Sequence, residues 1–275
     1  MPKSVLITGC SAGGIGHALA RSFASRGLTV FATARNPSSM VDLEQLPNVH
    51  LLSLNVTSTA SVAMAVAAVK EKTGSLHYVV NNAGMGHYLP ALDTDIEEAK
   101  KVMDVNFWGQ LRVSQGFAPL LIASKGTIVN IGSIAAFMNR PYNCIYTASK
   151  AGGHALGEIL RLELAPFGVK VLTVITGCIG TALHDKILPP KLIDGSIYSS
   201  LGGKLEDIAN TKDPTDQDPE SYAEGVVEDV LAGKTGKVWH GKNSSLIKYG
   251  HVLLPQFYID YNMTSNSGLE TLRKP

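Results

Sequence analysis

The segment SVLITGCSAGGIG (residues 4–16) decides the fold of this chain. Its first residues are mainly apolar and β-branched, which is typical of a strand, and an amphipathic stretch typical of a helix follows over Ile15–Arg26. Glycines between a strand and a helix allow a tight turn and bring the N–H groups of the helix N-terminus close to a bound phosphate. A flexible glycine turn is the alternative, but the placement favours a phosphate-binding loop.

The same alternation of short strand-like runs and longer amphipathic stretches continues along the chain. Strands are expected at Ser4–Thr8, Thr29–Ala34, His50–Leu54, Tyr78–Asn81, Gly126–Ile131 and Lys170–Ile175. Helices are expected at Ile15–Arg26, Ala60–Lys72, Glu97–Ser124 with a break near Val105 left open, and Tyr146–Phe167. Near-continuous apolar strands indicate a parallel sheet covered on both faces. The sequence therefore predicts an α/β protein with a Rossmann-type, doubly wound parallel sheet of about seven strands.

The character of the sequence changes after the sixth expected strand. Residues 176–218 are rich in glycine, proline and aspartate, so we expect an insertion over the ligand site, with a substrate lid at 184–218. A helix is expected at Glu220–Ala232 and a last strand at Lys237–Trp239. An aromatic, irregular C-terminal extension follows at 240–275. We interpret residues 1–275 as one domain that contains the lid.

The composition excludes several classes of protein. The chain of 275 residues has 24 Lys and Arg against 23 Asp and Glu, and it lacks a long basic run, so nucleic-acid binding is not expected. Three distant cysteines and eight histidines show no spacing typical of disulfides or metal ligands, so no metal is expected. Neither a secretory signal nor an apolar run of roughly 18 residues is visible. These features favour a cytoplasmic protein without a transmembrane segment.

A tyrosine and a lysine at the start of the fourth expected helix indicate proton-transfer chemistry. Tyr146 and Lys150 are four residues apart, so a helix places both side chains on one face, where the ammonium can stabilise a phenolate. A free tyrosine has a pKa of about 10, and general acids work best nearer ambient pH. A half-buried structural tyrosine is the alternative reading of Tyr146 alone.

The second expected strand ends in Thr33-Ala34-Arg35, without the acidic residue that binds the adenosine ribose hydroxyls of NAD. Arg35 instead offers a positive charge to a 2′-phosphate, and a solvated surface arginine is the alternative. The sequence therefore favours NADPH/NADP+ over NAD(H).

Together these motifs resemble the short-chain dehydrogenase/reductase family. The loop TGCSAGGIG (8–16) is similar to the family's Thr-Gly-x-x-x-Gly-x-Gly with one extra residue, so that Gly14 and Gly16 align with the last two family glycines and Gly13 is the insertion. The family's Asn-Asn-Ala-Gly motif is present at residues 81–84. Ser133, 13 residues before Tyr146, completes the family's Ser and Tyr-x-x-x-Lys arrangement.

The resemblance implies a role for each catalytic residue. Tyr146 donates a proton to the substrate carbonyl oxygen as hydride arrives from the nicotinamide, and Ser133 hydrogen-bonds the developing oxyanion. Lys150 holds the nicotinamide ribose and tunes Tyr146. Asn106 matches the family's fourth catalytic position and supports a water-linked proton path.

The resemblance also implies a set of residues that bind the cofactor. Thr176 stands where the family has a proline, while Gly177 and Thr181 are retained after it. The expected cofactor-binding residues are Gly9, Ser11, Gly14, Ile15, Gly16, Arg35, Asn55, Val56, Asn82, Ala83, Gly84, Tyr146, Lys150, Gly177, Ile179 and Thr181.

Within the family the chain is most similar to fungal NADPH-dependent 1-acyldihydroxyacetone-phosphate reductases, which implies reduction of a lipophilic ketone. Hydroxysteroid-type dehydrogenases and secondary-metabolite ketoreductases share its features and stay open as alternatives. An inactive NADPH-binding scaffold or sensor is an alternative of another class, and the presence of all four catalytic residues argues against it. Apolar lid residues such as Ile193, Ile197, Leu201 and Leu205 either line the pocket or pack the lid.

The expected partners are a small-molecule carbonyl or alcohol substrate and further copies of the chain, as a homodimer or homotetramer. The aromatic segment Tyr249–Tyr261 is too short to span a bilayer. It either rests on a lipid surface, as on a lipid droplet or the endoplasmic reticulum, or closes the pocket or a subunit interface, which we favour.

Overall fold

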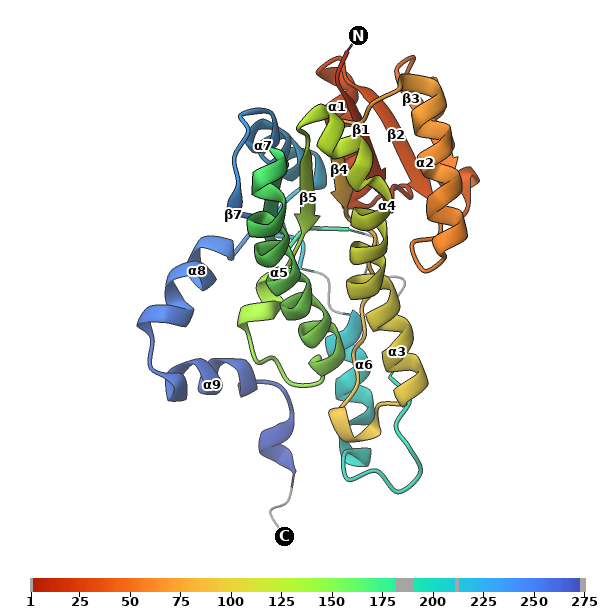
Figure 1. Cartoon of the computed structure of the whole chain (residues 1–275). Coiled ribbons are helices and arrows are strands. Elements are labelled where there is room, and N and C mark those ends of the chain that lie inside the picture. The colour runs from red at the N-terminus through yellow and green to blue at the C-terminus, as the bar shows by residue number, and fades with distance from the viewer. Residues whose placement is uncertain (1, 182–189, 211–212, 273–275) are drawn as a thin grey trace.

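A computed structural model of the chain describes residues 2–181, 190–210 and 213–272. Its strands form one parallel sheet in the order β3-β2-β1-β4-β5-β6-β7 (Figure 1). They are β1 (Ser4–Thr8), β2 (Thr29–Ala34), β3 (Val49–Ser53), β4 (Tyr78–Asn81), β5 (Thr127–Ile131), β6 (Lys170–Thr176) and β7 (Gly236–His240). The predicted doubly wound sheet is confirmed, and each expected strand end lies within one residue of the observed end.

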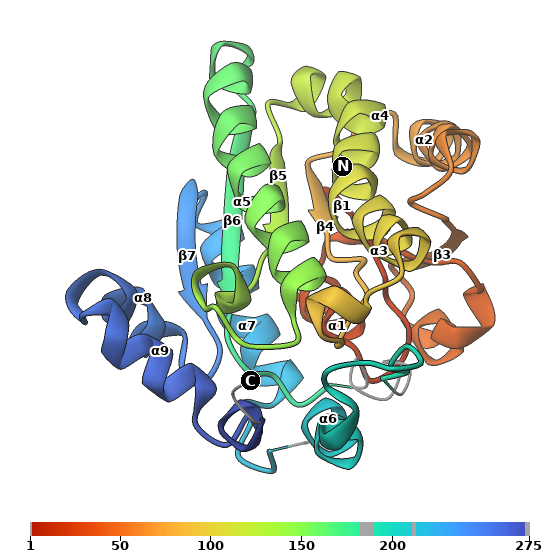
Figure 2. The same cartoon turned by 90° about the horizontal axis from the view of Figure 1, so that it is seen from below.

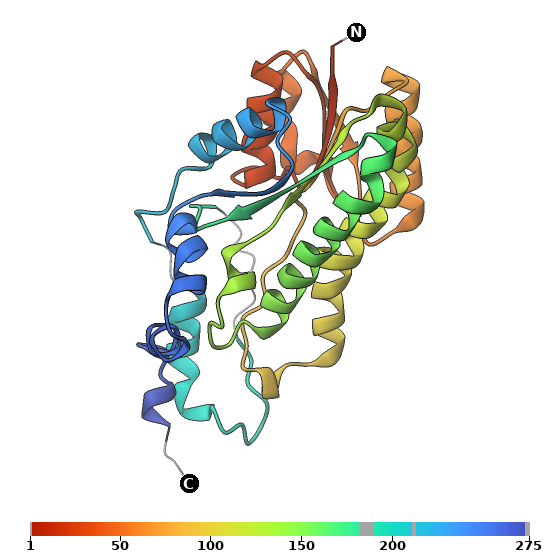
Figure 3. The ribbon, with the colours of Figure 1, turned by 60° about the vertical axis from the view of Figure 1, so that its left-hand side comes forward.

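Helices cover both faces of this sheet, as Figure 3 shows. Two helices lie on one face, α1 (Ile15–Ser25) and α7 (Pro219–Leu231). The other face is covered by α2 (Thr59–Thr73), α4 (Gly109–Ser124) and α5 (Cys144–Leu164). All five residues of β1 are buried because side chains on both of its faces pack against helices. This burial explains why the strands have no polar alternation in the sequence.

The long helix predicted at Glu97–Ser124 is interrupted near Val105. Helix α3 (Ile96–Met103) passes into a π-helical turn, Asp104–Trp108, and α4 follows directly. A π turn inserts one extra residue into the helix and is frequent at functional sites. Here the turn contains Asn106, whose buried side chain points into the site described below.

Short helices complete the connections. Asn36 caps the first of them through its side chain, which accepts a hydrogen bond from the N–H of Ser38. These 3₁₀ segments are Pro37–Gln45, Ala91–Asp93, Ile134–Phe137, Ala165–Phe167, Ser199–Leu201 and Leu269–Thr271.

The expected lid at 184–218 is described only in part, because residues 184–189 and 211–212 lie outside the described residues. The rest contains α6 (Gly202–Asn210). Leu201 and Leu205 are buried in a cluster with Tyr142, which precedes α5, whereas Ile193 and Ile197 are exposed. The buried carboxylate of Asp93 accepts a hydrogen bond from Ser196 at 2.6 Å. The described part of this segment is therefore held against the rest of the fold by apolar packing and a buried hydrogen bond.

The prediction that the C-terminal extension is irregular is wrong. Residues Ser244–Leu253 form α8 and Gln256–Thr264 form α9. The two helices are separated at Pro255, because a proline forces the preceding Leu254 into an extended conformation. Figures 1 and 2 show α8 and α9 beside each other at one side of the molecule, beyond β7 and away from β3.

The extension contacts the loop between β5 and α5, and its Leu269 packs against Leu201 and Leu205 of the lid. The ring of His251 in α8 lies 4.8 Å from that of Phe137, centroid to centroid. The hydroxyl of Tyr142 donates to the carbonyl oxygen of Ser267 at 3.0 Å. The other apolar side chains of α8 and α9 are largely exposed, for example Leu253 at 75% and Phe257 at 76%.

Candidate active site

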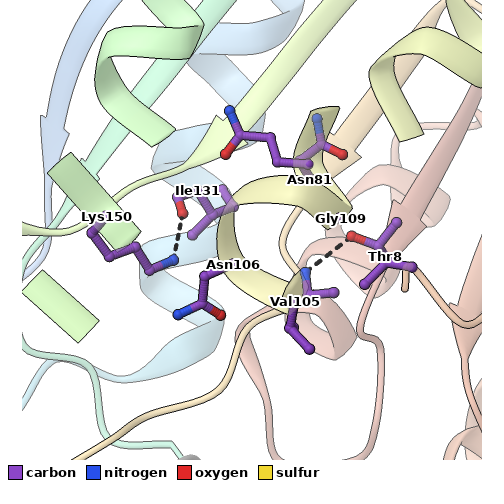
Figure 4. A pocket seen from close by; sticks show the side chains of 10 residues that line it. Thr8, Asn81, Val105, Asn106, Gly109, Ile131 and Lys150 are labelled. Carbon is purple, nitrogen blue, oxygen red and sulfur yellow. Dashed lines mark hydrogen bonds between the residues drawn. The ribbon is translucent and has the colours of Figure 1, made fainter. Parts of the chain in front are cut away.

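The predicted site residues meet at the carboxyl ends of the central strands. The strand order reverses between β1 and β4, which is where doubly wound sheets bind their ligands. A small cavity at this point is lined by Thr8, Asn81, Asn106, Ile131 and Lys150, among others (Figure 4). These residues come from β1, β4, the π turn, β5 and α5, so the fold collects them from five elements.

The glycine loop is shaped as a cradle for a phosphate-containing ligand. Gly9 has φ +76° and Gly13 has φ +72°, a backbone region that favours glycine. A Cβ atom on Gly16 would lie 2.5 Å from the carbonyl oxygen of Gly9, so the helix and the loop approach too closely for a side chain. Gly14 is the N-cap of α1 and provides no side-chain cap, so the first N–H groups of α1 face the loop.

The extra residue in this loop is absorbed in a turn. The N–H of Gly14 donates to the carbonyl oxygen of Ser11 at 3.2 Å, and Gly13 supplies the positive φ that the turn needs. Ile15 is the first residue of α1 and packs partly buried against the core. Gly14 and Gly16 thus keep their expected positions at the start of the helix.

The Asn-Asn-Ala-Gly segment braces this loop from the side. The Nδ2 of Asn82 donates to the carbonyl oxygens of Thr8 at 2.8 Å and Gly9 at 3.0 Å. The hydroxyl oxygen of Thr8 accepts from the N–H groups of Asn82 and Ala83, both at 2.9 Å. Gly84 follows, where an added Cβ would lie 3.7 Å from the Nζ of Lys150. These residues link the glycine loop to the catalytic side chains.

The end of β2, where the adenosine of the cofactor is expected, has a cationic side chain and two nearby hydroxyl groups. Arg35 is exposed at the end of β2. The hydroxyls of Ser11 and Ser39 lie 3.1 Å apart, and the N–H of Ala12 donates to the carbonyl oxygen of Ser39 at 2.9 Å. Sequence reasoning missed Ser39, although Asn36, a helix-capping residue three positions earlier, signals the turn that brings it there.

The third strand contributes two residues near this end. The Oδ1 of Asn55 accepts from the N–H and the hydroxyl of Thr57, so its Nδ2 is the group that can face a ligand. Val56 is buried against Gly109, where an added Cβ would approach the Cγ2 of Val56 to 2.9 Å.

Ser133 and Tyr146 are brought together by β5 and α5. The Ser133 hydroxyl lies within hydrogen-bonding reach of the Tyr146 hydroxyl, and it accepts a hydrogen bond from the N–H of Ala135 at 3.1 Å. Burial raises the pKa of Tyr146, and the hydrogen bond with Ser133 opposes this rise. The expected lowering of the Tyr146 pKa by Lys150 is not found. The Nζ of Lys150 lies 5.7 Å from the ring centroid of Tyr146 and donates instead to the carbonyl oxygen of Ile131 at 3.0 Å (Figure 4).

Lys150 is itself strongly affected by its surroundings. Burial lowers its pKa from 10.5 to about 8, because the charged ammonium loses contact with water. The side chain therefore remains cationic at neutral pH but titrates within reach of ordinary assay conditions.

Asn106 is held rigidly in the π turn. Its Oδ1 accepts from the N–H of Met85 at 2.9 Å, and its Nδ2 donates to the carbonyl oxygen of Met85 at 3.0 Å and to the hydroxyl of Ser149 at 2.9 Å. The amide thus ties the loop after β4 to α5, beside Lys150 in the cavity (Figure 4).

The segment after β6 is fixed by β7 and the residues that follow it. A Cβ on Gly177 would lie 2.1 Å from the carbonyl oxygen of Lys242, so only glycine fits there. Ile179 is buried, and Thr181 is the last residue described before the gap. Thr176, which replaces the family's proline, hydrogen-bonds the hydroxyl of Tyr222 at 2.6 Å.

Two further polar residues near the site were not predicted. Arg140, between Ser133 and Tyr146, places its guanidinium carbon 5.8 Å from the ring centroid of Tyr88. His154 contacts Ser133 directly, through a hydrogen bond from the Ser133 N–H to its Nε2. Their signal lies in spatial contacts between distant parts of the sequence. Among the described residues no group of His, Cys, Asp or Glu forms a metal site, and no helix is long and apolar enough to cross a membrane.

Comparison with known proteins gives similarities along most of the chain. Residues 3–191 match the family described as short chain dehydrogenase. The chain is 41% identical over 270 residues to "Short-chain dehydrogenase ptmH" of Penicillium ochrochloron, which covers 97% of this chain and 98% of that protein. It is 47% identical over 187 residues to "NADPH-dependent 1-acyldihydroxyacetone phosphate reductase" of Schizosaccharomyces pombe, which covers 68% of this chain and 63% of that protein. A crystal structure of a short chain dehydrogenase from Burkholderia cenocepacia J2315 in complex with NADP matches with a TM-score of 0.74 at 26% identity, covering 100% of this chain and 98% of that one.

Proposed function

The chain belongs to the short-chain dehydrogenase family, and from this membership we propose that it is an NADP(H)-dependent oxidoreductase that reduces a ketone to an alcohol. One observation carries the proposal. Ser133 lies close enough to Tyr146 for its hydroxyl to influence the pKa of the phenol, and Lys150 lies beside them at the carboxyl ends of the strands, next to the glycine cradle.

The residues present fit a dinucleotide. The uncapped start of α1 offers N–H groups to a pyrophosphate, and the positive φ of Gly9 and the close approach of Gly16 leave room for it. Bound NADPH supplies the hydride. Gly14, Ile15 and the braced Asn82–Gly84 segment surround the same cradle.

In the proposed mechanism Tyr146 is the general acid. Its hydroxyl donates a proton to the substrate carbonyl oxygen, and the hydroxyl of Ser133 donates a second hydrogen bond to the same oxygen as negative charge develops on it. Lys150, still protonated below a pKa of about 8, lies 5.7 Å from the ring centroid of Tyr146 and would hold the nicotinamide ribose. Asn106 fixes the loop after β4 against α5, which keeps the cavity in shape.

The preference for NADPH rests on charge at the end of β2. Arg35 and the paired hydroxyls of Ser11 and Ser39 offer one cation and two hydrogen-bonding groups to a 2′-phosphate. The names of the reductase from Schizosaccharomyces pombe and of the Burkholderia cenocepacia complex, which contain NADPH and NADP, support the same choice.

We propose a lipophilic ketone as substrate, with an acyl-dihydroxyacetone-phosphate-like compound as one candidate and a secondary-metabolite or steroid-like ketone as the other. The buried cluster of Tyr142, Leu201 and Leu205 packs the described part of the lid against the loop that leads to Tyr146. Arg140 favours a substrate with an anionic group. Burial raises the pKa of Tyr88 to about 12, so the phenol that contacts Arg140 stays neutral and is not a counter-charge to the guanidinium.

The decisive experiment follows NADPH consumption with a panel of ketones, including acyl ketone phosphates. Tyr146→Phe removes the proton donor but keeps the ring, so kcat should fall about 100- to 10,000-fold while the Kd of NADPH stays nearly the same. Near-wild-type turnover by this variant, on a substrate that the wild type reduces, would refute the role of Tyr146.

The anionic group is tested separately with Arg140→Gln. This variant should raise KM about tenfold or more for a ketone that bears a carboxylate or phosphate, because a hydrogen bond to a charged group is lost. The matched methyl ester or neutral ketone should keep its KM. Equal effects on the charged and neutral ketones would show that Arg140 does not face the substrate.

The exposed apolar face of α8 and α9 indicates a partner, because such patches are uncommon on monomers. We propose that it covers a subunit interface of a homodimer or homotetramer, with a peripheral contact to a lipid droplet or the endoplasmic reticulum as the alternative. The cytoplasm is the proposed location in either case.

A further inference from the structure

We infer that His154 is a positioning residue that fixes Ser133 for catalysis by accepting the hydrogen bond of its backbone N–H. The inference rests on the proposed function for its effect on turnover. Its structural basis is a contact between α5 and the end of β5 that the catalytic motif does not include.

His154 continues the catalytic face of α5. Tyr146, Lys150 and His154 follow each other at intervals of four residues, so their side chains leave the helix on one side. The Nε2 of His154 lies 3.1 Å from the backbone nitrogen of Ser133, and the Nζ of Lys150 donates to the carbonyl oxygen of Ile131. Two successive turns of α5 therefore hydrogen-bond to the end of β5: His154 accepts a hydrogen bond there, and Lys150 donates one.

The residue between these two contacts must be glycine. A Cβ on Gly132 would lie 2.3 Å from the Nε2 of His154, inside any real contact distance. The N–H of Gly132 donates to the carbonyl oxygen of Val174 at 2.8 Å, which ties the strand end to β6 as well. The ring of His154 occupies the space that a side chain at position 132 would need, so the ring can lie there only because residue 132 is glycine.

The ring of His154 is suited to a permanent acceptor role. It is 6% exposed and packs against Phe137, with the ring centroids 5.4 Å apart. Burial, together with the nearby charges of Lys150 and Lys237, lowers its pKa from 6.5 to about 3. The imidazole is therefore neutral at physiological pH. Because Nε2 accepts the Ser133 N–H, the ring proton resides on Nδ1.

The consequence for catalysis follows from where Ser133 lies. Its hydroxyl lies within reach of that of Tyr146, so a shift of the Ser133 backbone changes the distance between the two groups that would meet the substrate oxygen. Displacements of about 1 Å at a reacting centre can cost about 100-fold in rate. Without an acceptor on α5, the buried N–H of Ser133 would also lose its hydrogen-bond partner. An unpaired buried N–H is unfavourable, so the loop that contains Ser133 would be displaced toward another acceptor.

A double-mutant cycle tests the inference. His154→Met keeps an apolar side chain of similar length but offers no nitrogen acceptor, whereas His154→Gln keeps an acceptor oxygen. We expect H154M to lower kcat about 10- to 100-fold with an unchanged Kd for NADPH, and H154Q to restore most of it. In the Ser133→Ala background H154M should lower kcat no further, because the residue acts through the Ser133 hydroxyl. An additive loss, or a kcat for H154M equal to the wild type, would overturn the inference.

A spectroscopic measurement separates this inference from the proposed function. In protein labelled with 15N at serine and histidine, the wild-type Nε2 of His154 should have the chemical shift of an unprotonated acceptor. The Ser133 amide should shift in H154M and return toward its wild-type position in H154Q. A protonated Nε2 in the wild type, or an unmoved Ser133 amide, refutes the contact whatever the enzyme reduces. A wild-type kcat in Ser133→Ala, with the amide shifts as expected, would instead count against the proposed function and confine His154 to a structural role.

Discussion

Acid should destabilise this protein in a pH range where its carboxylates are still ionised, and His154 should be a main cause. The folded chain holds the imidazole neutral, with its pKa lowered from 6.5 to about 3 by burial. The unfolded chain takes up a proton on the same histidine below about pH 6.5. The contribution of His154 is therefore complete above pH 6.5 and is lost as the pH falls toward 3, because protonation favours the unfolded state.

The size of the effect follows from the shift. Each pH unit below the ordinary pKa of histidine lowers the free energy of unfolding by about 1.4 kcal/mol for one such group, until the folded pKa is reached. At about pH 4.5 the loss from His154 is on the order of 3 kcal/mol. This is a large share of the roughly 5–15 kcal/mol by which natural proteins are stable.

His154→Gln isolates this contribution, because glutamine keeps an acceptor for the Ser133 N–H but does not titrate. Urea unfolding at several pH values between about 4.5 and 7.5 should show a steep fall in the wild type and a shallower one in H154Q. Burial also lowers the pKa of His50, His77 and His87, but these residues are present in both proteins and cancel in the difference. Parallel pH profiles for the two proteins would show that the imidazole is not held neutral, and the reasoning would fail.

Two other substitutions test the cofactor and the C-terminal helices. Ala34→Asp combined with Arg35→Ala should shrink or reverse the preference for NADPH over NADH, since loss of one charged contact removes roughly 10- to 150-fold and the new carboxylate repels a 2′-phosphate. The measurement is kcat/KM for both cofactors at low and moderate salt, and an unchanged ratio would show that Arg35 only faces solvent. Leu253→Glu with Phe257→Glu places charges on the exposed apolar face of α8 and α9, so the molecular mass in solution should drop to that of a smaller assembly. Liposome flotation is measured alongside it: loss of flotation at constant mass would favour the lipid surface, and no change in either would exclude both contacts.

The arrangement of strands could be predicted from the sequence because parallel strands buried on both faces are nearly all apolar. The observed ends of β1, β2 and β4 coincide with the predicted ends. The glycine loop and the spacing of Tyr146 and Lys150 are local features as well, since a strand, a turn and one helix face determine them. Because such features depend on residues close together in the sequence, they can be recognised from the sequence alone.

The C-terminal helices were missed for the opposite reason. Helix α9 has no buried residue and therefore no apolar stripe facing a core, so the periodic signal that identifies surface helices is absent. The pKa of Tyr146 was also misjudged, because spacing on a helix face places Lys150 nearby but does not reveal that its ammonium turns to the carbonyl oxygen of Ile131.

The sequence by itself determined the sheet, the glycine loop and the spacing of the proposed catalytic side chains, because each depends on neighbours within a turn or a strand. Only the tertiary structure decided how those side chains are held. The His154 contact with Ser133 joins residues 21 positions apart, and the Ser39 contact with Ser11 joins residues 28 apart. Hydrogen bonds of this kind depend on distances that arise when α5 packs on β5 and when the loop after β2 folds over the start of α1. The periodicity of the sequence does not predict these hydrogen bonds, because they depend on how one helix or strand packs against another.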